Sequence, residues 1–209
     1  MKHIYFVRHG QTAANIRKIH QSPDEPLTPK GRKQAQHAAL VLKHRDIDTL
    51  ICSSYARARE TAGIISDEIG VPFLIDKSVV EFKRPDSLYH KSHFSPRSLW
   101  YVLQMFLHRE DEKWENDGAE NIFAVRNRVL DAQRMIKGLI GERIVIVSHT
   151  IFMNMFLSMS CKESSLNLYE FLLALFHAND TPNGGIIHMY YDERVPEGMC
   201  KWQLIEYIN

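Results

Sequence analysis

Residues 4–10 read Ile-Tyr-Phe-Val-Arg-His-Gly. The four apolar, β-favouring residues at the start of this stretch predict a short buried strand that ends at Arg8 and His9. Residues 144–147 (Ile-Val-Ile-Val) form a second run of this kind and lead into Ser148-His149 in the same way. Strands without polar alternation are typical of parallel sheets that helices cover on both faces.

Helical patterns fill the intervals between the predicted strands. Thr28-Pro29 has the N-cap residue and the first-turn proline that open a helix, and Gly70 and Pro72 mark the end of the next one. This alternation predicts an α/β fold with a mainly parallel central sheet and helices on both faces. The expected helices span about 29–44, 56–69, 97–108, 120–137, 151–159 and 164–176, and further strands span 50–52, 73–75, 186–191 and 202–208.

The length of 209 residues suits one domain with a sizeable core, so residues 1–209 are predicted to form a single domain. Residues 10–27 are polar and rich in turn-forming residues. Residues 82–118 are irregular in pattern apart from the helix expected near 97–108. We therefore expect residues 82–118 to form an inserted helical lid.

The bulk composition excludes several classes of protein. A formal net charge of +1 gives no reason to expect nucleic-acid binding, and no apolar run approaches the ~20 residues of a membrane span. The three cysteines, Cys52, Cys161 and Cys200, are scattered and form no C-x-x-C pair. They predict no disulfide framework and no cysteine-based zinc site, and they favour a reducing, cytoplasmic location.

Polar residues that can bind an anion follow three of the predicted strands. Arg8-His9-Gly10 ends the first, Ser53 leads to Arg57 after the second, and Ser148-His149 ends a third. In open α/β sheets, ligands bind at the carboxyl ends of the strands. Arginine forks match phosphate or carboxylate, and Gly10 would let the backbone approach a ligand closely. The sequence therefore predicts an anion pocket that contains two imidazoles.

Each of these residues also has an ordinary structural interpretation. A histidine at a strand end is usually structural, and Arg57 could form a surface ion pair with Glu60 on its own helix. Thr12 and Asn15 are common turn residues. The occurrence of all of them at neighbouring strand ends is what favours a functional site.

With these motifs the chain resembles the histidine phosphatase superfamily, the phosphoglycerate-mutase-like proteins, in its phosphatase branch. The motifs occur in the family's order over about residues 3–150. Two departures are Tyr55, where leucine is usual, and Thr150, where glycine is common. The matching stretches are Arg8-His9-Gly10-Gln11-Thr12-x-x-Asn15, Pro26-Leu27-Thr28-x-x-Gly31-x-x-Gln34-Ala35, Ser53-x-x-x-Arg57-Ala58-x-x-Thr61-Ala62, Glu81, Gly118-x-Glu120 and Val147-Ser148-His149.

The resemblance implies a phosphatase that forms a phosphohistidine intermediate on a neutral His9. It implies that Glu81 donates a proton to the leaving group, and that a protonated His149 takes part in catalysis. The phosphate would be bound by Arg8, Thr12, Asn15, Arg57 and His149. Neither a metal nor another cofactor is expected, since the arginines supply the positive charge. The alternative for Glu81 is a solvated loop carboxylate.

The lid is rich in basic and aromatic residues, and Lys83 and Arg84 directly follow the candidate acid. Either cation is a candidate to contact a second phosphate of the substrate, although a solvated helix face would have a similar composition. The expected substrate is a small phosphorylated metabolite or a phosphoprotein. Neither a nucleic-acid nor a membrane partner is expected, and the terminal strands would allow a dimer through an exposed sheet edge.

Two other functions stay open. A cofactor-dependent mutase of the phosphoglycerate type would return the phosphoryl group from His9 to another hydroxyl. Such mutases carry a Tyr-Gly-Gly-rich stretch after the acid, and residues 82–100 show none, which favours a phosphatase. A non-catalytic module that only binds a phospholigand is disfavoured, because both histidines, both arginines and an acid are present.

Overall fold

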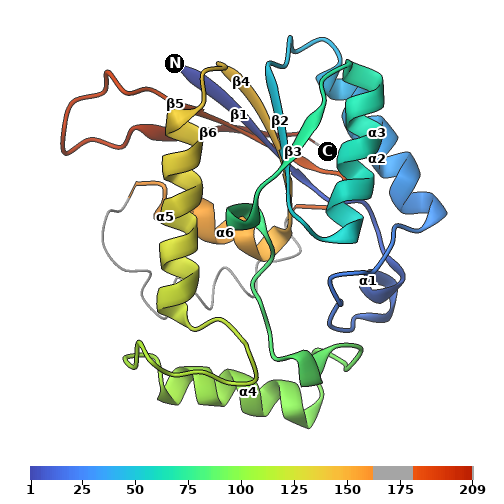
Figure 1. Cartoon of the computed structure of the whole chain (residues 1–209), viewed down its shortest axis with the longest axis vertical. Helices are drawn as coiled ribbons and strands as arrows, with labels where there is room; N and C mark the ends of the chain where they lie inside the picture. The colour runs from blue at the N-terminus through green and yellow to red at the C-terminus, as the bar shows by residue number, and fades with distance from the viewer. Residues whose placement is uncertain (162–180, 209) are drawn as a thin grey trace.

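The computed structural model describes residues 1–161 and 181–208, and its centre is a six-stranded sheet in the order β3-β2-β4-β1-β5-β6 (Figure 1). The pairs β1·β4, β4·β2 and β2·β3 are parallel, whereas β1·β5 and β5·β6 are antiparallel. The sheet is therefore mainly parallel, as predicted. The strands are β1 (Lys2–Arg8), β2 (Thr49–Cys52), β3 (Phe73–Ile75), β4 (Arg143–Ser148), β5 (Ile186–Tyr191) and β6 (Trp202–Ile208).

Helices cover both faces of the sheet, which confirms the second part of the prediction. Figure 1 shows α2 (Pro29–Leu42) and α3 (Ala56–Ile69) on one side and α5 (Ile122–Gly138) and α6 (Thr150–Met159) on the other. The central strands are buried on both faces because alternate residues serve two cores. On β1, Tyr5 and Val7 pack in the core under α2 and α3, whereas Ile4 and Phe6 pack in the core under α5 and α6.

Within the described residues, the predicted strands and helices agree with the structure to within about two residues, whereas three short helical elements were not predicted. Residues 10–27 contain a short helix, α1 (Ala13–Arg17), which has no apolar periodicity and was not predicted. The helix expected at 164–176 lies outside the described residues. Two single turns of 3₁₀ helix, η1 (Lys77–Val79) and η2 (Asp86–Leu88), and the helix α4 (Pro96–Leu107) complete the described set. None of the described helices is both long and apolar enough to cross a bilayer.

The lid, residues 82–118, is attached to the loop that follows α1. The backbone N–H of His20 donates to the carbonyl of Lys91 at 2.9 Å, and that of His90 donates to the carbonyl of His20 at 2.9 Å. The ring Nε2 of His20 and the hydroxyl of Ser98 on α4 are 2.9 Å apart. Burial lowers the pKa of His20 to about 3, so this ring is a neutral part of the junction.

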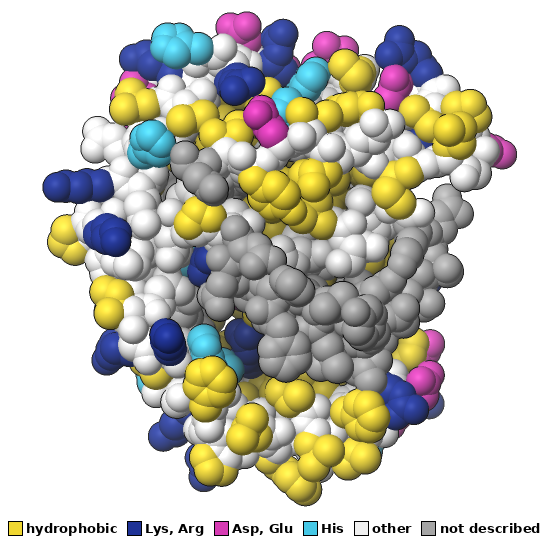
Figure 2. All heavy atoms as spheres, turned by 180° about the vertical axis from the view of Figure 1, so that it is seen from behind, with side chains coloured by type: hydrophobic (Ala, Val, Ile, Leu, Met, Phe, Trp, Pro, Cys, Tyr) yellow, Lys and Arg dark blue, Asp and Glu magenta, His cyan; other side chains and the backbone are white. Residues whose placement is uncertain are grey.

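Much of α4 is apolar but exposed. Only Ser98, Tyr101 and Met105 are buried on this helix, whereas Trp100 is 60% exposed. Figure 2 shows hydrophobic side chains gathered at the lower end of the molecule, the end at which Figure 1 places α4. The exposed apolar residues of the helix are Leu99, Trp100, Val102, Leu103, Phe106 and Leu107.

The sequence predicted no disulfide framework, and the structure contains one disulfide that the pattern of cysteines did not indicate. Cys161, just after α6, is bonded to Cys200, which precedes β6, and their Cα atoms are 4.8 Å apart. The pair is 39 residues apart in the sequence, and only the return of the chain along β5 and β6 brings the two together. Cys52 is a free, buried thiol on β2. Cysteine usage therefore does not support a reducing location.

Candidate active site

The sheet order brings together the three strand ends at which the sequence predicted site residues. Because β2, β4 and β1 are parallel neighbours, their carboxyl ends lie side by side at one edge of the sheet. The backbone N–H of His9 donates to Ser148 at 3.0 Å, and that of Ser53 donates to Val147 at 3.0 Å. The rings of His9 and His149 lie 5.1 Å apart, centroid to centroid. The two imidazole rings thus lie side by side, as the sequence predicted.

Gly10 serves a purpose different from the one expected. A Cβ at Gly10 would lie 2.2 Å from the carbonyl oxygen of Gly31, and a Cβ at Gly31 would lie 2.2 Å from the carbonyl of Gln11. The two glycines therefore let the loop after β1 pack directly on the start of α2, backbone against backbone. The close approach is to the protein's own chain.

The hydrogen bonds of His9 define its tautomer. Its Nδ1 lies 2.8 Å from the carbonyl oxygen of Gly10, which can only accept, so Nδ1 carries the proton. Its Nε2 accepts from Nε of Arg57 at 3.2 Å, so Nε2 presents a lone pair. Burial is the main cause that holds the pKa of His9 well below its usual value, and the charges of Arg57 and Arg8 act in the same direction. His9 is a neutral imidazole.

Arg57 is held in the site and not on the helix surface. Its side chain is 2% exposed, its Nη1 donates to the carbonyl of Ser22 at 2.9 Å, and its guanidinium lies over the ring of Tyr55. Glu60 instead forms an ion pair with Arg32 at 2.6 Å. The alternative that Arg57 pairs with Glu60 is therefore wrong. Burial lowers the pKa of Arg57 to about 10, which leaves it charged at neutral pH.

Arg8 lies at the end of β1 beside the same pocket. Its Nη1 donates to the carbonyl of Thr181 at 2.5 Å. Burial lowers the pKa of Arg8 to about 10, although the nearby charge of Glu81 opposes this shift. Both arginines thus remain cations, and the charge of Glu81 acts on Arg57 as it does on Arg8.

His149 is fully buried at the N-terminus of α6. Its Nε2 lies 2.8 Å from the hydroxyl of Ser53, and its Nδ1 has no hydrogen-bond partner among the described residues. Burial, followed by the charge of Arg57, holds the pKa of His149 well below its usual value. The expectation of a protonated His149 therefore does not describe the free protein, in which three nearby arginines oppose a further positive charge. An anion in the pocket is needed to favour the charged ring.

Glu81 is positioned by the same helix terminus. Its Oε1 accepts from the backbone N–H of Phe152 at 3.0 Å and from that of Phe82 at 2.9 Å, and its Oε2 accepts from Ile151 at 3.4 Å. Backbone N–H groups in the first turn of a helix stabilise negative charge. Glu81 is thus anchored beside His149, unlike a solvated loop carboxylate.

Sequence reasoning assigned no role to the residues that hold Glu81 in place. Arg128 on α5 binds Glu120 through two nitrogens at 2.6 and 2.7 Å, and it donates to the carbonyl of Val80 at 2.6 Å. Glu120 in turn accepts from the backbone N–H of Lys83 at 2.8 Å. The pair clamps both sides of Glu81. Glu120 was visible in the sequence only as part of a motif, and nothing pointed to its partner.

Thr12 and Asn15 form a capping box at the start of α1. Oδ1 of Asn15 accepts from the backbone N–H and the hydroxyl of Thr12, and also from Asn183 at 3.3 Å. The side-chain nitrogen of Asn15, Nδ2, has no partner within the described ranges and is available as a donor. Asn183, which the sequence did not single out, also donates to the carbonyl of His9 at 3.1 Å. Phosphate binding remains a prediction for Asn15, and the structure gives Thr12 a capping role.

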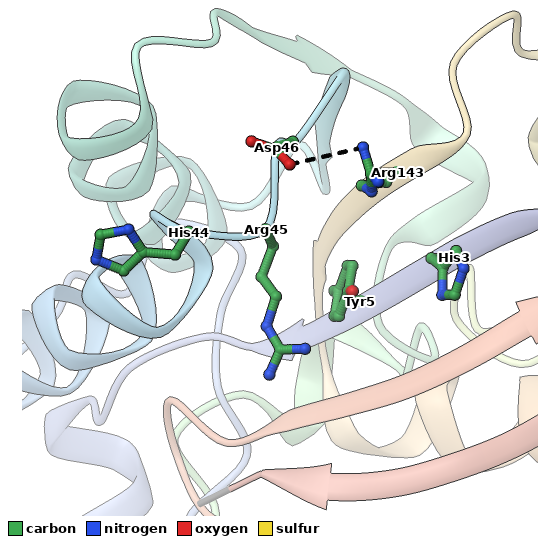
Figure 3. A pocket seen from close by; sticks show the side chains of 6 residues that line it. All are labelled: His3, Tyr5, His44, Arg45, Asp46 and Arg143. Carbon is green, nitrogen blue, oxygen red and sulfur yellow. Dashed lines mark ion pairs between the residues drawn. The ribbon is translucent and has the colours of Figure 1, made fainter.

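A separate cavity lies at the amino ends of the strands, away from these residues (Figure 3). Its volume is about 240 Å³, and Arg143 pairs with Asp46 across it at 3.8 Å. It shares no residue with the site around His9. Within residues 1–161 and 181–208, no three His, Cys, Asp or Glu side chains are grouped so that they could hold a metal ion.

A family model for the histidine phosphatase superfamily (branch 1) matches residues 4–179. The chain therefore belongs to the histidine phosphatase superfamily. It is 31% identical over 164 residues to the probable phosphoglycerate mutase GpmB of Shigella dysenteriae serotype 1 (strain Sd197), a match that covers 72% of this chain and 71% of the relative.

Solved structures share the fold at low sequence identity. An alpha-ribazole phosphatase from Shigella flexneri has a TM-score of 0.75 and 18% identity, with 99% of this chain and 96% of that chain covered. A mycobacterial glucosyl-3-phosphoglycerate phosphatase in complex with VO3 has a TM-score of 0.70 and 19% identity, with 98% of each chain covered. These likenesses establish the architecture, and the superfamily contains proteins named as phosphatases and as mutases.

The two buried imidazoles make stability depend on pH. In the unfolded chain both histidines bind a proton below the ordinary histidine pKa of 6.5, whereas in the folded protein both stay neutral. The unfolded state then binds more protons, so the free energy of unfolding is expected to fall as pH drops from about 7 to 5. Each histidine contributes a slope of up to about 1.4 kcal/mol per pH unit.

Urea unfolding at several pH values measures this slope. His9→Ala should reduce it by one histidine's share, and His44→Ala, which removes an exposed ring at the other end of the sheet, should leave it unchanged. A slope that is the same in all three proteins would contradict the neutral state of His9.

Proposed function

We propose that the protein is a phosphatase that hydrolyses a phosphomonoester through a phosphohistidine intermediate on His9. The observation that carries this proposal is the contact of 3.2 Å between Nε of Arg57 and the lone pair on Nε2 of His9. A phosphoryl group that binds Arg57 is placed beside the atom that attacks it. Positioning and cationic donors provide most of the catalysis in phosphoryl transfer.

In the first step, Nε2 of His9 attacks phosphorus and forms a P–N bond. The bond between phosphorus and the leaving oxygen breaks, its electron pair stays on that oxygen, and Glu81 supplies the proton that yields the alcohol. The hydrogen bond from Nδ1 of His9 to Gly10 stabilises the positive charge that develops on the ring. Arg8, Arg57 and Asn15 donate to the phosphoryl oxygens, and His149 presents its second ring nitrogen to the same group.

In the second step, water attacks the phosphorus of phosphohistidine. The carboxylate of Glu81 accepts a proton from this water, the P–N bond breaks, and its electron pair returns to Nε2 of His9. Inorganic phosphate then leaves. The substrate is a small phosphorylated metabolite or a phosphoprotein, and the arginines provide the positive charge that the transfer requires.

A mutase activity is the second candidate, and the similarity to a relative named as a probable phosphoglycerate mutase favours it. A mutase would use the same first step and return the phosphoryl group to another hydroxyl of the bound ligand. A module that binds a phospholigand without turnover is the third. It is disfavoured, since the lone pair on Nε2, the acid and both arginines are all in place.

A phosphate-release screen tests the proposal. Sugar phosphates, phosphoglycerates, nucleotides and phosphopeptides are offered to the protein, and the assay is repeated with 2,3-bisphosphoglycerate to detect isomerisation. A phosphatase releases phosphate without any added bisphosphate. Isomerisation of phosphoglycerate without phosphate release would establish the mutase instead, and tight binding without either product would establish the binding module.

A further inference from the structure

Arg84 is a cation beside the site that forms no direct ion pair with any described residue, although the charge of Glu81 acts on it. It follows Glu81 by three positions, and its guanidinium carbon lies 5.7 Å from the centre of the Phe82 ring. The side chain is partly buried, and it forms no hydrogen bond or ion pair to the part of the chain that the structure describes. A guanidinium withdrawn from water without a partner is costly. The position therefore suits an anion that arrives with a ligand.

The neighbours of Arg84 place it between the acid and the lid. Glu81, Tyr101 and Tyr89 act electrostatically on Arg84, and after burial the charge of Arg84 is the next cause that lowers the pKa of His20 and of His93. Burial lowers the pKa of Arg84 itself. Arg84 thus lies close to Glu81, the proposed acid, and its charge also reaches Arg57, although no contact joins it to His9 or His149 within the described residues.

The in-line geometry of phosphoryl transfer indicates which part of the substrate would lie near Arg84. His9 attacks phosphorus from one side, and the leaving oxygen departs on the opposite side, towards Glu81, because the attacking and leaving atoms of the transfer are roughly in line. The alcohol part of the substrate therefore extends towards the lid. Among the described residues, Arg84 is a cation close to Glu81 on this path.

We propose that Arg84 binds a second anionic group on the alcohol part of the substrate, so that preferred substrates are phosphomonoesters whose leaving group bears a carboxylate or another phosphate. This inference rests on the proposed phosphatase activity. The planar fork of Arg84 matches either group through two hydrogen bonds. The ring of Phe82 beside the guanidinium provides apolar surroundings in which such a pair gains strength.

Lys83 does not share this position, although it is adjacent in sequence and carries the same charge. It is exposed, and its ammonium nitrogen lies 3.3 Å from where a Cβ of Gly118 would be. Hydrogen bonds from Ser87 are the main cause that lowers the pKa of Asp117, and the charge of Lys83 acts in the same direction. Lys83 therefore points to the outer side of the lid and serves as a matched control.

The test compares three substrates with similar primary alkyl leaving groups: glycerol 3-phosphate, 3-phosphoglycerate, which adds a carboxylate, and propane-1,3-diol bisphosphate, which adds a phosphate. The wild-type protein is expected to favour one or both of the last two by about tenfold or more in kcat/KM. Arg84→Gln should lose about 10- to 100-fold on the favoured substrates, mainly through KM, and change less than about threefold on glycerol 3-phosphate. Arg84→Lys should be intermediate, and Lys83→Gln should match the wild type.

Equal losses on all three substrates in Arg84→Gln would overturn the inference, as would the absence of any preference in the wild type. Calorimetric binding of the same three compounds to His9→Ala, with and without Arg84→Gln, tests the subsite without turnover. Preferential binding that depends on Arg84 supports the inference even if no phosphate is released. In that case only the proposed phosphatase activity fails.

Discussion

His9→Ala is expected to reduce phosphate release by roughly 10⁴-fold or more, because the substitution removes Nε2, the atom that we propose attacks phosphorus. The loss should appear in kcat with every substrate, whether the leaving group is an alkyl or an aryl alcohol. The fold should persist, since Nδ1 of His9 bonds to the carbonyl of its own neighbour Gly10. Steady-state kinetics together with circular dichroism measure both effects.

The intermediate itself can be measured. Rapid quenching of the wild-type reaction with a labelled substrate should trap a protein-bound phosphate that is labile in acid and stable in base, as a P–N bond is. His9→Ala should trap none, and the control His44→Ala should trap as much as the wild type. A full yield of label in His9→Ala would show that another residue is the nucleophile.

Glu81→Gln is expected to give the second largest effect, and the effect should depend on the leaving group. An alkyl phosphate should lose about 10²- to 10⁴-fold in kcat, because its alkoxide needs a proton, whereas 4-nitrophenyl phosphate should lose only a few-fold in the transfer step. The amide oxygen of glutamine can still accept from the backbone N–H groups of Phe82 and Phe152 that now bond Oε1. The local structure should therefore be retained.

Pre-steady-state bursts separate the transfer step from hydrolysis of the intermediate, which also uses Glu81. Glu110→Gln is the matched control, since Glu110 is an exposed carboxylate of the lid that follows Glu81 in the sequence. A Glu81→Gln variant that slows the transfer step equally for alkyl and aryl substrates would argue against the role of acid.

The sequence was informative wherever a pattern is local. Apolar runs located the strands, and the N-cap at Thr28 located the start of α2, because these signals arise from residues within one or two turns of each other. The strand-end rule then brought His9, Arg57 and His149 to one edge of the sheet. The resemblance to the superfamily added Glu81. No local pattern in the sequence indicates that this side chain lies beside the N-terminus of α6.

The remaining features depend on pairs of residues that are distant in the sequence. The Arg128–Glu120 clamp acts on the loop at Val80, far earlier in the chain, and Cys161 meets Cys200 only through the β5–β6 hairpin. The neutral state of His149 in the free protein was not foreseen for a similar reason. Its burial and the three arginines around it belong to the assembled pocket, whereas the sequence shows only a histidine after a strand.

The backbone contact between Gly10 and Gly31 also bears on how the molecule folds. The loop that carries His9 has no side chain at Gly10 to hold it, and it is supported by α2, which starts only at Pro29. We therefore expect the loop to take its final shape only when α2 has docked on the sheet. Regained activity after dilution from denaturant would then report the docking of α2 rather than the formation of β1.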